Sequence, residues 1–264
     1  MRNFYIAITI VFVFVIGFIG VFYLTQKEDL NDVEPSNDLR NDFQQMDLRL
    51  EFIPLEGVES QEIHVLNEDD EIIFNLTIDE LNQWTRENWD IFEEAPEVGG
   101  RPVEPDNFGF FDRAASISDD NKKMVFSVSD YAVAMTTSFV IVADIRSGDL
   151  VMINEPTQGS AEEYYWSKDN NLIAYTTGTG RAAGDFLLVD DVKNFERKFI
   201  LREDELLEVL DPDEEMFEVG QFMPIFQNLQ WSEDRLFFTT EHPENGQLRW
   251  SINKDGANLK KVTE

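Results

Sequence analysis

The sequence contains no cysteine and only two histidines, and these shortages remove most of the usual catalytic and metal-binding chemistry. Without cysteine the chain has no disulfide, no thiol nucleophile and no cysteine metal site. His64 and His242 lie in distant segments, so a histidine acid–base or metal site would need both of them. We therefore predict no catalytic residue and no cofactor. The compartment stays open, because exported domains with a large core do without disulfides.

Basic residues are also scarce. The chain has 21 Lys and Arg against 53 Asp and Glu, which gives a formal net charge of -32 and a pI near 4.2. A polyanion would be repelled by this field, so we exclude nucleic acid as a partner. The same charge would attract cations or basic proteins. The simpler alternative is that the charge serves solubility or adaptation to a salty medium.

Charge is absent altogether from a run of 21 residues that begins at Phe4 and ends at Leu24. As a helix this run would reach roughly 31 Å, close to the thickness of a bilayer's hydrocarbon core. A cleaved signal peptide is the alternative, but its apolar stretch is shorter and ends in a small-x-small site that is missing here. We predict an uncleaved, single-pass membrane anchor. The short N-terminal tail would lie inside and the large remainder outside, although the positive-inside rule has only Arg2 and Lys27 to act on.

The predicted organisation has four parts: a cytoplasmic tail at 1–3, the anchor at 4–24, an acidic flexible stalk at 25–46, and an extracytoplasmic domain at 47–264. The stalk has too few apolar residues to order itself. Alternating residues at 48–54 predict a half-buried strand, and 63–66 and 72–76 flank a turn at 67–70 as in a hairpin. Thr77 and Glu80 match a capping box, which predicts a short amphipathic helix running to about Phe92.

Three later segments repeat one another, at 116–127, 165–176 and 230–239. Each reads as a strand, a tight Ser-x-Asp turn and a second strand, and short Ser and Asp oxygens suit such a turn. A further hairpin follows each unit, at 139–144, 186–190 and 248–252, and the last one leads to an Asp-Gly turn. The predicted turn residues are Ser118, Asp120, Ser167, Asp169, Ser232, Asp234, Asp255 and Gly256.

These repeats resemble the blades of TolB-like β-propellers, which are related in architecture to WD-repeat proteins and read Trp-Ser-x-Asp-Gly, strand, loop, strand, Asp-Gly. The unit that starts at Trp231 matches best, Ile117 replaces the Trp of the first unit, and the glycine after the turn Asp is missing in all three. The resemblance implies an all-β fold, a small or incomplete propeller of about four or five blades. The hairpin at 63–77 would be a decayed blade. Open sheet edges in an incomplete ring would invite a partner strand or self-association.

Other motifs carry little chemistry. The glycine-rich segment 178–184 follows a strand, but another strand rather than a helix follows it, so we interpret it as a hairpin loop and not a phosphate loop. The acidic segment 211–215 lacks the spacing of a calcium loop, and Ser160 lacks the setting of a nucleophile elbow. Asn75 begins a glycosylation sequon that matters only in a eukaryotic secretory pathway. Whether any metal binds is left open.

The function we predict is a membrane-anchored, non-catalytic binding or assembly module with a protein partner in the cell envelope. Members of the family that it resembles present loops to protein partners. Two alternatives stay open. Related propellers also cap serine peptidases, so the chain could be a cap or accessory subunit of a membrane-associated peptidase. A calcium-responsive sensor would instead use the acidic loops.

Overall fold

A computed structural model describes residues 47–54, 60–88, 97–98, 101–102, 108–130, 137–153, 157–159, 161, 163–178, 186–202, 205–206, 209, 225–242 and 246–262. The chain divides into two compact units, Met1–Gln45 and Met46–Glu264, and every described residue belongs to the second. The predicted anchor and stalk lie outside the described residues. Among the described helices, none is long and apolar enough to cross a bilayer.

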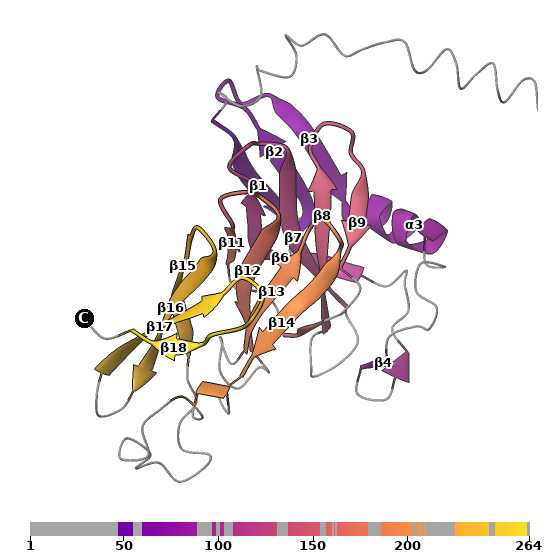
Figure 1. The fold of residues 1–264 in the computed structure, drawn as a ribbon. Coiled ribbons are helices and arrows are strands. Elements are labelled where there is room, and N and C mark those ends of the chain that lie inside the picture. The colour runs from indigo at the N-terminus through magenta and orange to yellow at the C-terminus, as the bar shows by residue number, and fades with distance from the viewer. Residues whose placement is uncertain are drawn as a thin grey trace, which may run out of the picture. The chain divides into compact units, whose positions relative to one another are not determined.

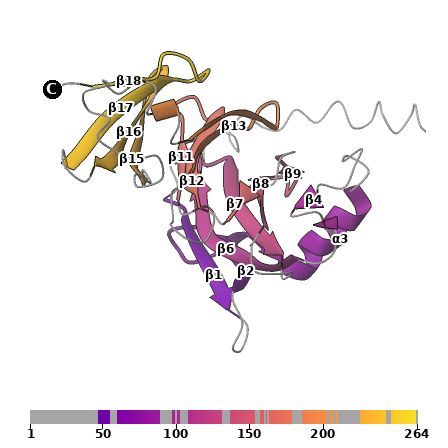
Figure 2. The same ribbon diagram turned by 90° about the horizontal axis from the view of Figure 1, so that it is seen from below.

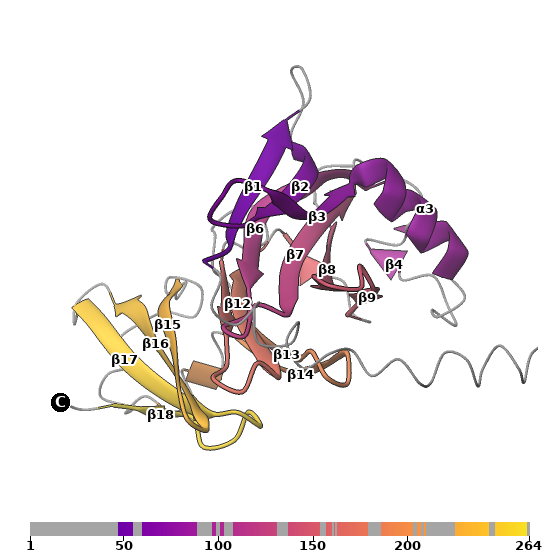
Figure 3. The same ribbon diagram turned by 90° about the horizontal axis from the view of Figure 1, so that it is seen from above.

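The first sheet is a three-stranded antiparallel meander followed by a helix (Figure 1). Its strands are β1 (Arg49–Pro54), β2 (Ser60–Leu66) and β3 (Ile72–Thr77), and the helix is α3 (Ile78–Asn88). Figure 3 shows α3 continuing from the end of β3. The predicted capping box is confirmed: the Glu80 carboxylate accepts from the Thr77 N–H at 2.9 Å, and the Thr77 hydroxyl accepts from the Glu80 N–H at 3.2 Å. Trp89 to Phe92 lie outside the described residues.

Three further antiparallel sheets follow in chain order (Figures 1 and 2). The second has the order β10-β8-β7-β6, with β9 also paired to β8; the third and fourth run β11-β12-β13-β14 and β15-β16-β17-β18. Among the described residues, one more ladder joins the short strands β4 and β5. The bounds are β4 (Glu97–Val98), β5 (Arg101–Pro102), β6 (Phe108–Ile117), β7 (Lys123–Asp130), β8 (Thr137–Asp144), β9 (Leu150–Met152), β10 (Thr157–Gln158), β11 (Tyr164–Trp166), β12 (Leu172–Thr177), β13 (Phe186–Asp191), β14 (Glu196–Leu201), β15 (Phe226–Ser232), β16 (Arg235–His242), β17 (Gly246–Asn253) and β18 (Lys260–Lys261).

Each sheet shares an apolar core with the next. One cluster joins the first sheet and α3 to the second sheet, a second joins the second and third sheets, and a third joins the third and fourth. Large side chains such as Phe126, Tyr175 and Trp250 are fully buried within these clusters. The second and third sheets each have a neighbouring sheet on both sides. Both faces of each therefore carry apolar side chains.

The tryptophan of the repeat links the third and fourth sheets each to the sheet before it. The indole N–H of Trp166 donates to the Ser116 carbonyl at 3.4 Å, and that of Trp231 donates to the Tyr165 carbonyl at 3.0 Å. Ser116 and Tyr165 occupy equivalent places in their units, one residue before the Trp position. Ile117 has no N–H in its side chain, so the second sheet cannot make the same bond to the first.

Among the described residues, four successive antiparallel sheets pack one against the next, and equivalent tryptophan bonds join the second sheet to the third and the third to the fourth, which makes the fold propeller-like. This agrees with the all-β prediction and with the number of blades expected. The hairpin at 63–77 is confirmed as β2 and β3, part of the first sheet. The strand expected at 48–54 is confirmed as β1, which pairs with β2.

Candidate functional site

Two of the three predicted turns have the expected local bonds. The Ser118 hydroxyl donates to Asp120 at 2.8 Å and accepts from the Lys123 N–H at 3.0 Å. The Ser167 hydroxyl donates to Asp169 at 2.7 Å and accepts from the Leu172 N–H at 2.9 Å. Each buried serine therefore closes its own hairpin and holds an aspartate beside it.

The missing glycines of the repeat have a local explanation. Asn121 and Asn170 have φ values of 57° and 53°, in the left-handed region that glycine usually occupies. Asparagine tolerates this region better than other residues, because its short polar side chain bonds locally. Asn170 also accepts, through its side-chain oxygen, from the Asp119 N–H at 3.3 Å, so the turns of the second and third sheets touch.

The third turn is different because the sequence there is two residues shorter. β15 ends at Ser232 and β16 begins at Arg235, which leaves a two-residue loop with Glu233 at a φ of 49°. Asp234 forms an ion pair with Lys254 instead of a bond with Ser232. Asp234 lies in this loop and Ser232 is the last residue of the strand before it, and the Ser-to-Asp bond of the other two units is absent here among the described contacts.

The Asp-Gly turn also serves as a contact between sheets. Gly256 has a φ of 83°, and a Cβ atom there would lie 3.1 Å from the ring of Phe199 in β14. The Asp255 carboxylate accepts from the Ala257 N–H at 3.0 Å. All eight predicted turn residues therefore lie in or beside the hairpin turns that join neighbouring strands of a sheet. Among the described contacts, none of them is brought into a catalytic arrangement with another.

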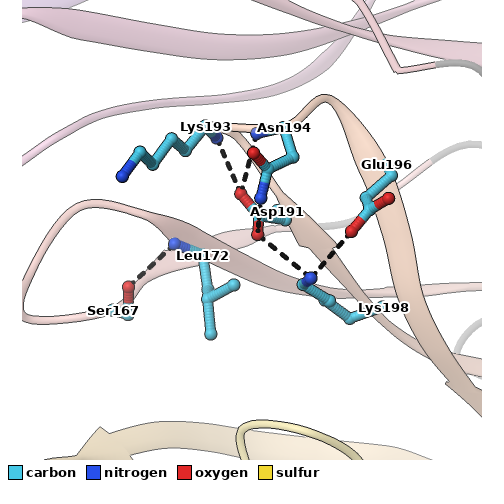
Figure 4. A network of polar contacts seen from close by, with 7 residues as sticks. All are labelled: Ser167, Leu172, Asp191, Lys193, Asn194, Glu196 and Lys198. Carbon is cyan, nitrogen blue, oxygen red and sulfur yellow. Dashed lines mark hydrogen bonds and ion pairs between the residues drawn. The ribbon is translucent and has the colours of Figure 1, made fainter.

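In the third sheet, the turn between β13 and β14 corresponds to the Asp-Gly turn of the fourth sheet, and Asp191 holds it in place (Figure 4). Its carboxylate accepts from the backbone N–H groups of Lys193 and Asn194 at 2.8 and 2.9 Å, and pairs with Lys198 at 3.2 Å. Partial burial would raise the pKa of Asp191, but these bonds outweigh it and the pKa lies below 3.8. Lys198 also bonds Glu196 at 2.7 Å, and its pKa is raised by Glu196 and then by Asp191.

The turn bonds also make the chain's stability depend on pH. The Ser167 hydroxyl is the main cause that holds the pKa of Asp169 below its usual 3.8. A carboxyl whose pKa is lower in the folded state stabilises the fold at pH values above 3.8, and this stabilisation is lost as the pH falls through the lowered pKa. Burial opposes ionisation of Asp120, but bonds from Lys122 and Ser118 lower its pKa as well.

We therefore expect Ser167→Ala to cost about 1–2 kcal/mol of unfolding free energy at pH 7, mostly by leaving the Leu172 N–H without its partner. A smaller part of the loss should vanish at a pH below the lowered pKa of Asp169, where the carboxyl is protonated in both states; it is small because Asp169 is exposed. Urea denaturation at both pH values measures this. Ser147→Ala is the control, since Ser147 bonds Asp149 in the same way on an exposed turn, and equal losses would contradict the prediction.

A buried ionic cluster in the third sheet was not predicted. Asp190 is fully buried and pairs with Arg197 at 2.8 Å, where the two side chains are 0% and 5% exposed. The Tyr175 hydroxyl donates to Asp190 at 2.5 Å and accepts from Arg197 at 3.1 Å. Burial, and then the charge of Asp190, raises the pKa of Tyr175 well above 10.

A second buried polar group lies in the second sheet. Asp112 accepts from the hydroxyls of Ser129 and Ser138 at 2.7 and 3.1 Å. The hydroxyls of Tyr164 and Ser127 are also buried, and neither makes a hydrogen bond of standard geometry within the described part of the chain. Burial raises the pKa of Tyr164, and the charges of Asp112 and Asp190 add to that effect. The second and third sheets thus each bury polar side chains.

The histidines and the acidic residues form no metal site in the described part of the chain. His64 lies on β2 and bonds Glu62 at 3.1 Å, while His242 lies on β16 of the last sheet. Across the described ranges, no group of three or more His, Cys, Asp or Glu side chains is placed to hold a metal ion. Ser160 and the acidic segment 211–215 lie outside the described residues. Thr177 at the end of β12 pairs with Phe186 of β13, so the glycine-rich segment does connect two antiparallel strands as expected.

Among the described residues, acidic charge is concentrated on the first sheet and α3. The described residues of these elements, at 47–54 and 60–88, carry ten acidic side chains against two arginines. The described residues of the last sheet, at 225–242 and 246–262, carry four acidic against five basic side chains. Nine of the ten acids are exposed, and Glu62 is half-buried. The ten are Asp47, Glu51, Glu62, Glu68, Asp69, Asp70, Glu71, Asp79, Glu80 and Glu87.

No known family profile matches the sequence, and no curated protein matches it. Solved structures of low similarity do match. The β-propeller domain of the Trilobed protease from Pyrococcus furiosus is 13% identical with a TM-score of 0.47, over 82% of this chain and 53% of that one. The Pyrococcus horikoshii acylaminoacyl peptidase is 13% identical with a TM-score of 0.45, over 77% of this chain and 28% of that one. TolB from Acinetobacter baumannii is 12% identical with a TM-score of 0.36, over 76% and 37%.

The chain thus spans about half, or less, of the length of these three solved chains. Likenesses this distant say nothing of activity. The propeller-like architecture follows from the chain's own sheet order and inter-sheet bonds.

Proposed function

We propose that the chain is a binding or assembly module without catalytic activity, held to a membrane by residues 4–24, with its propeller-like domain outside and a basic protein partner in the cell envelope. The uneven charge of the sheets carries this proposal. Solubility alone would be served by acidic charge spread over all four sheets, but the described residues of the third and fourth sheets are close to neutral. Among the described residues the acidic excess is largest on the first sheet and α3, and a field of that sign attracts and orients a basic partner toward that surface.

The fold supports a binding role in a second way. The four sheets are held by their shared cores and by bonds between turns, so the exposed acidic side chains of the first sheet are displayed from a rigid support. Rigid display lowers the entropy lost on binding. Nothing in this role requires a nucleophile or a general base, and the predicted turn residues are all accounted for by hairpin structure.

Single cysteines test the proposal, because the natural chain has none and each introduced thiol is unique. Asp69→Cys places one on the first sheet, and Gln247→Cys places the matched control on the last sheet; both positions are exposed. In intact cells that make the full chain, a membrane-impermeant maleimide should label both sites. A maleimide–benzophenone cross-linker should then give a protein adduct from position 69, weakened by salt, and none from position 247.

Each part of the proposal can fail separately. Labelling only after the cells are broken open would contradict the outward topology. Equal adducts from both positions, or none from either, would contradict a partner-binding surface on the first sheet.

A further inference from the structure

The outer edges of the four sheets differ in how they are protected against strand pairing. β14 carries Glu196, Arg197 and Lys198, and β18 is two residues long with Lys260 and Lys261. β9 and β10 are only three and two residues long. Short edges and charged edges are the usual devices that prevent pairing with another chain.

β3 has neither device. It is six residues long, reads Ile-Ile-Phe-Asn-Leu-Thr and carries no charge. Among the described residues it pairs only with β2, so it is the last strand of a sheet that has three strands where the others have at least four. Ile72, at the start of β3, is 54% exposed. Val209, at 38%, is the other exposed large apolar side chain among the described residues.

The helix that follows β3 packs against the second sheet. The Asn82 side chain donates to the Phe108 carbonyl and accepts from the Phe108 N–H, both at 3.1 Å, which fixes α3 to β6 of the second sheet. Ile78 and Leu81 are buried in the core that the first two sheets share. The chain therefore continues into the second sheet from the end of β3 without supplying, among the described residues, a fourth strand.

We propose that the free edge of β3 binds an extended segment of the basic partner as a fourth strand of the first sheet. This rests on the proposed function and specifies how its partner is held. Backbone hydrogen bonds along β3 would supply much of the affinity, as in other cases of strand addition. The neutral, apolar sequence of β3 suits a segment with β-branched residues at its centre.

Charge at the two ends of β3 defines the flanks of that segment. Glu68 to Glu71 precede the strand, and Asp79 and Glu80 follow it within three residues. Lys or Arg on both sides of the added strand would face these acids. A second copy of β3 is a poorer occupant, because antiparallel pairing would bring the acids that precede β3 in each copy near the acids that follow it in the other, and like charges so placed repel.

The test uses full-length protein in detergent micelles and a fluorescent peptide, Lys-Lys-Val-Thr-Ile-Thr-Val-Thr-Lys-Lys. We expect binding that weakens with salt, and hydrogen exchange should show alternate amides of residues 72–77 gaining protection. A peptide of the same sequence with alternate backbone amides N-methylated keeps the charge but cannot form the ladder. It should bind at least about tenfold more weakly.

Two variants provide the matched comparison. Ile72→Lys puts a positive charge on the β3 edge, and Val209→Lys makes the same change at the other exposed apolar residue, 38% exposed. Ile72→Lys should weaken peptide binding about tenfold, while Val209→Lys should leave it unchanged. Both positions are exposed, so neither change should unfold the chain.

Other results would overturn the inference in distinguishable ways. If the N-methylated peptide binds as well as its parent and residues 72–77 gain no protection, strand addition is wrong although basic-partner binding survives. If neither peptide binds, both strand addition and the basic partner lose their support. If residues 72–77 become protected as the concentration of the protein alone rises, a second copy occupies the edge.

Discussion

Asp190→Asn should lower the free energy of unfolding by about 3–5 kcal/mol, because it removes the carboxylate that pairs with the buried Arg197 guanidinium. The amide keeps the size of the side chain, so the loss reports charge and hydrogen bonding rather than a cavity. The bond from the Tyr175 hydroxyl to Asp190, at 2.5 Å, is weakened at the same time. Urea denaturation of the full-length protein, followed by tryptophan fluorescence, measures the loss.

Asp70→Asn is the matched control. Asp70 also pairs with an arginine, at 2.6 Å, but the side chains of Arg49 and Asp70 are 54% and 75% exposed. Exposed pairs contribute about 0–1 kcal/mol. Asparagine also tolerates the φ of 64° at position 70, so no backbone strain confuses the comparison. Similar losses for the two variants would show that burial does not amplify the Asp190 pair.

The repeat suggests how the lost stability can be restored. In the third sheet Asp190 of β13 lies opposite Arg197 of β14. The equivalent pair in the second sheet is Ala143 of β8 and Leu150 of β9, and both of these residues are apolar. Phe126 occupies the place of Tyr175 in that sheet. The triple variant Tyr175→Phe, Asp190→Ala, Arg197→Leu copies the apolar set of the second sheet into the third. It should be much more stable than Asp190→Asn, since removing a whole buried ionic group costs far less than removing one partner.

Local patterns in the sequence were enough to predict the inner strands and hairpins of the sheets and the start of the helix, but not the edge strands β9, β10, β14 and β18. Ser118 and Ser167 identified their turns, and Thr77 with Glu80 identified the start of α3, because each involves residues close together in the chain. The tryptophans of the repeat were recognised as a motif, but their role was not, since the carbonyl that accepts from Trp231 lies 66 residues earlier.

Asp190 shows why the ionic cluster escaped prediction. The sequence Val-Asp-Asp at 189–191 looks like the Ala-Asp at 143–144, where the aspartate lies on an exposed turn. The structure places Asp191 on the equivalent turn and Asp190 at the buried position of Ala143. Only the pairing register with β14, where Arg197 arrives opposite Asp190, distinguishes them. The edge of β3 that is unpaired among the described residues could not be predicted from the sequence either. A strand is at an edge only when no other strand pairs with it, and local sequence does not show that.

Gly159→Ala is expected to have an effect as large as that of Asp190→Asn, for a steric reason. Gly159 follows β10, and a Cβ atom there would lie 1.7 Å from the carbonyl oxygen of Gly178 at the end of β12. Backbone cannot move aside as a flexible side chain can, so the second and third sheets would have to separate locally. The φ of 79° at Gly159 adds strain for any residue with a Cβ. We expect a loss of more than about 4 kcal/mol.

Gly148→Ala isolates the cost of the backbone angle. Gly148 has nearly the same φ, 77°, but a Cβ atom there would meet nothing within 4 Å. That variant should lose only about 1–2 kcal/mol, the cost of a left-handed alanine. Asparagine separates the two effects further, because it tolerates the angle but still has a Cβ: Gly148→Asn should be close to neutral, and Gly159→Asn should remain severe. If both Gly159 variants melted within a few degrees of the natural chain, the close approach of Gly159 to Gly178 would be wrong, and with it the contact that brings the ends of β10 and β12 together.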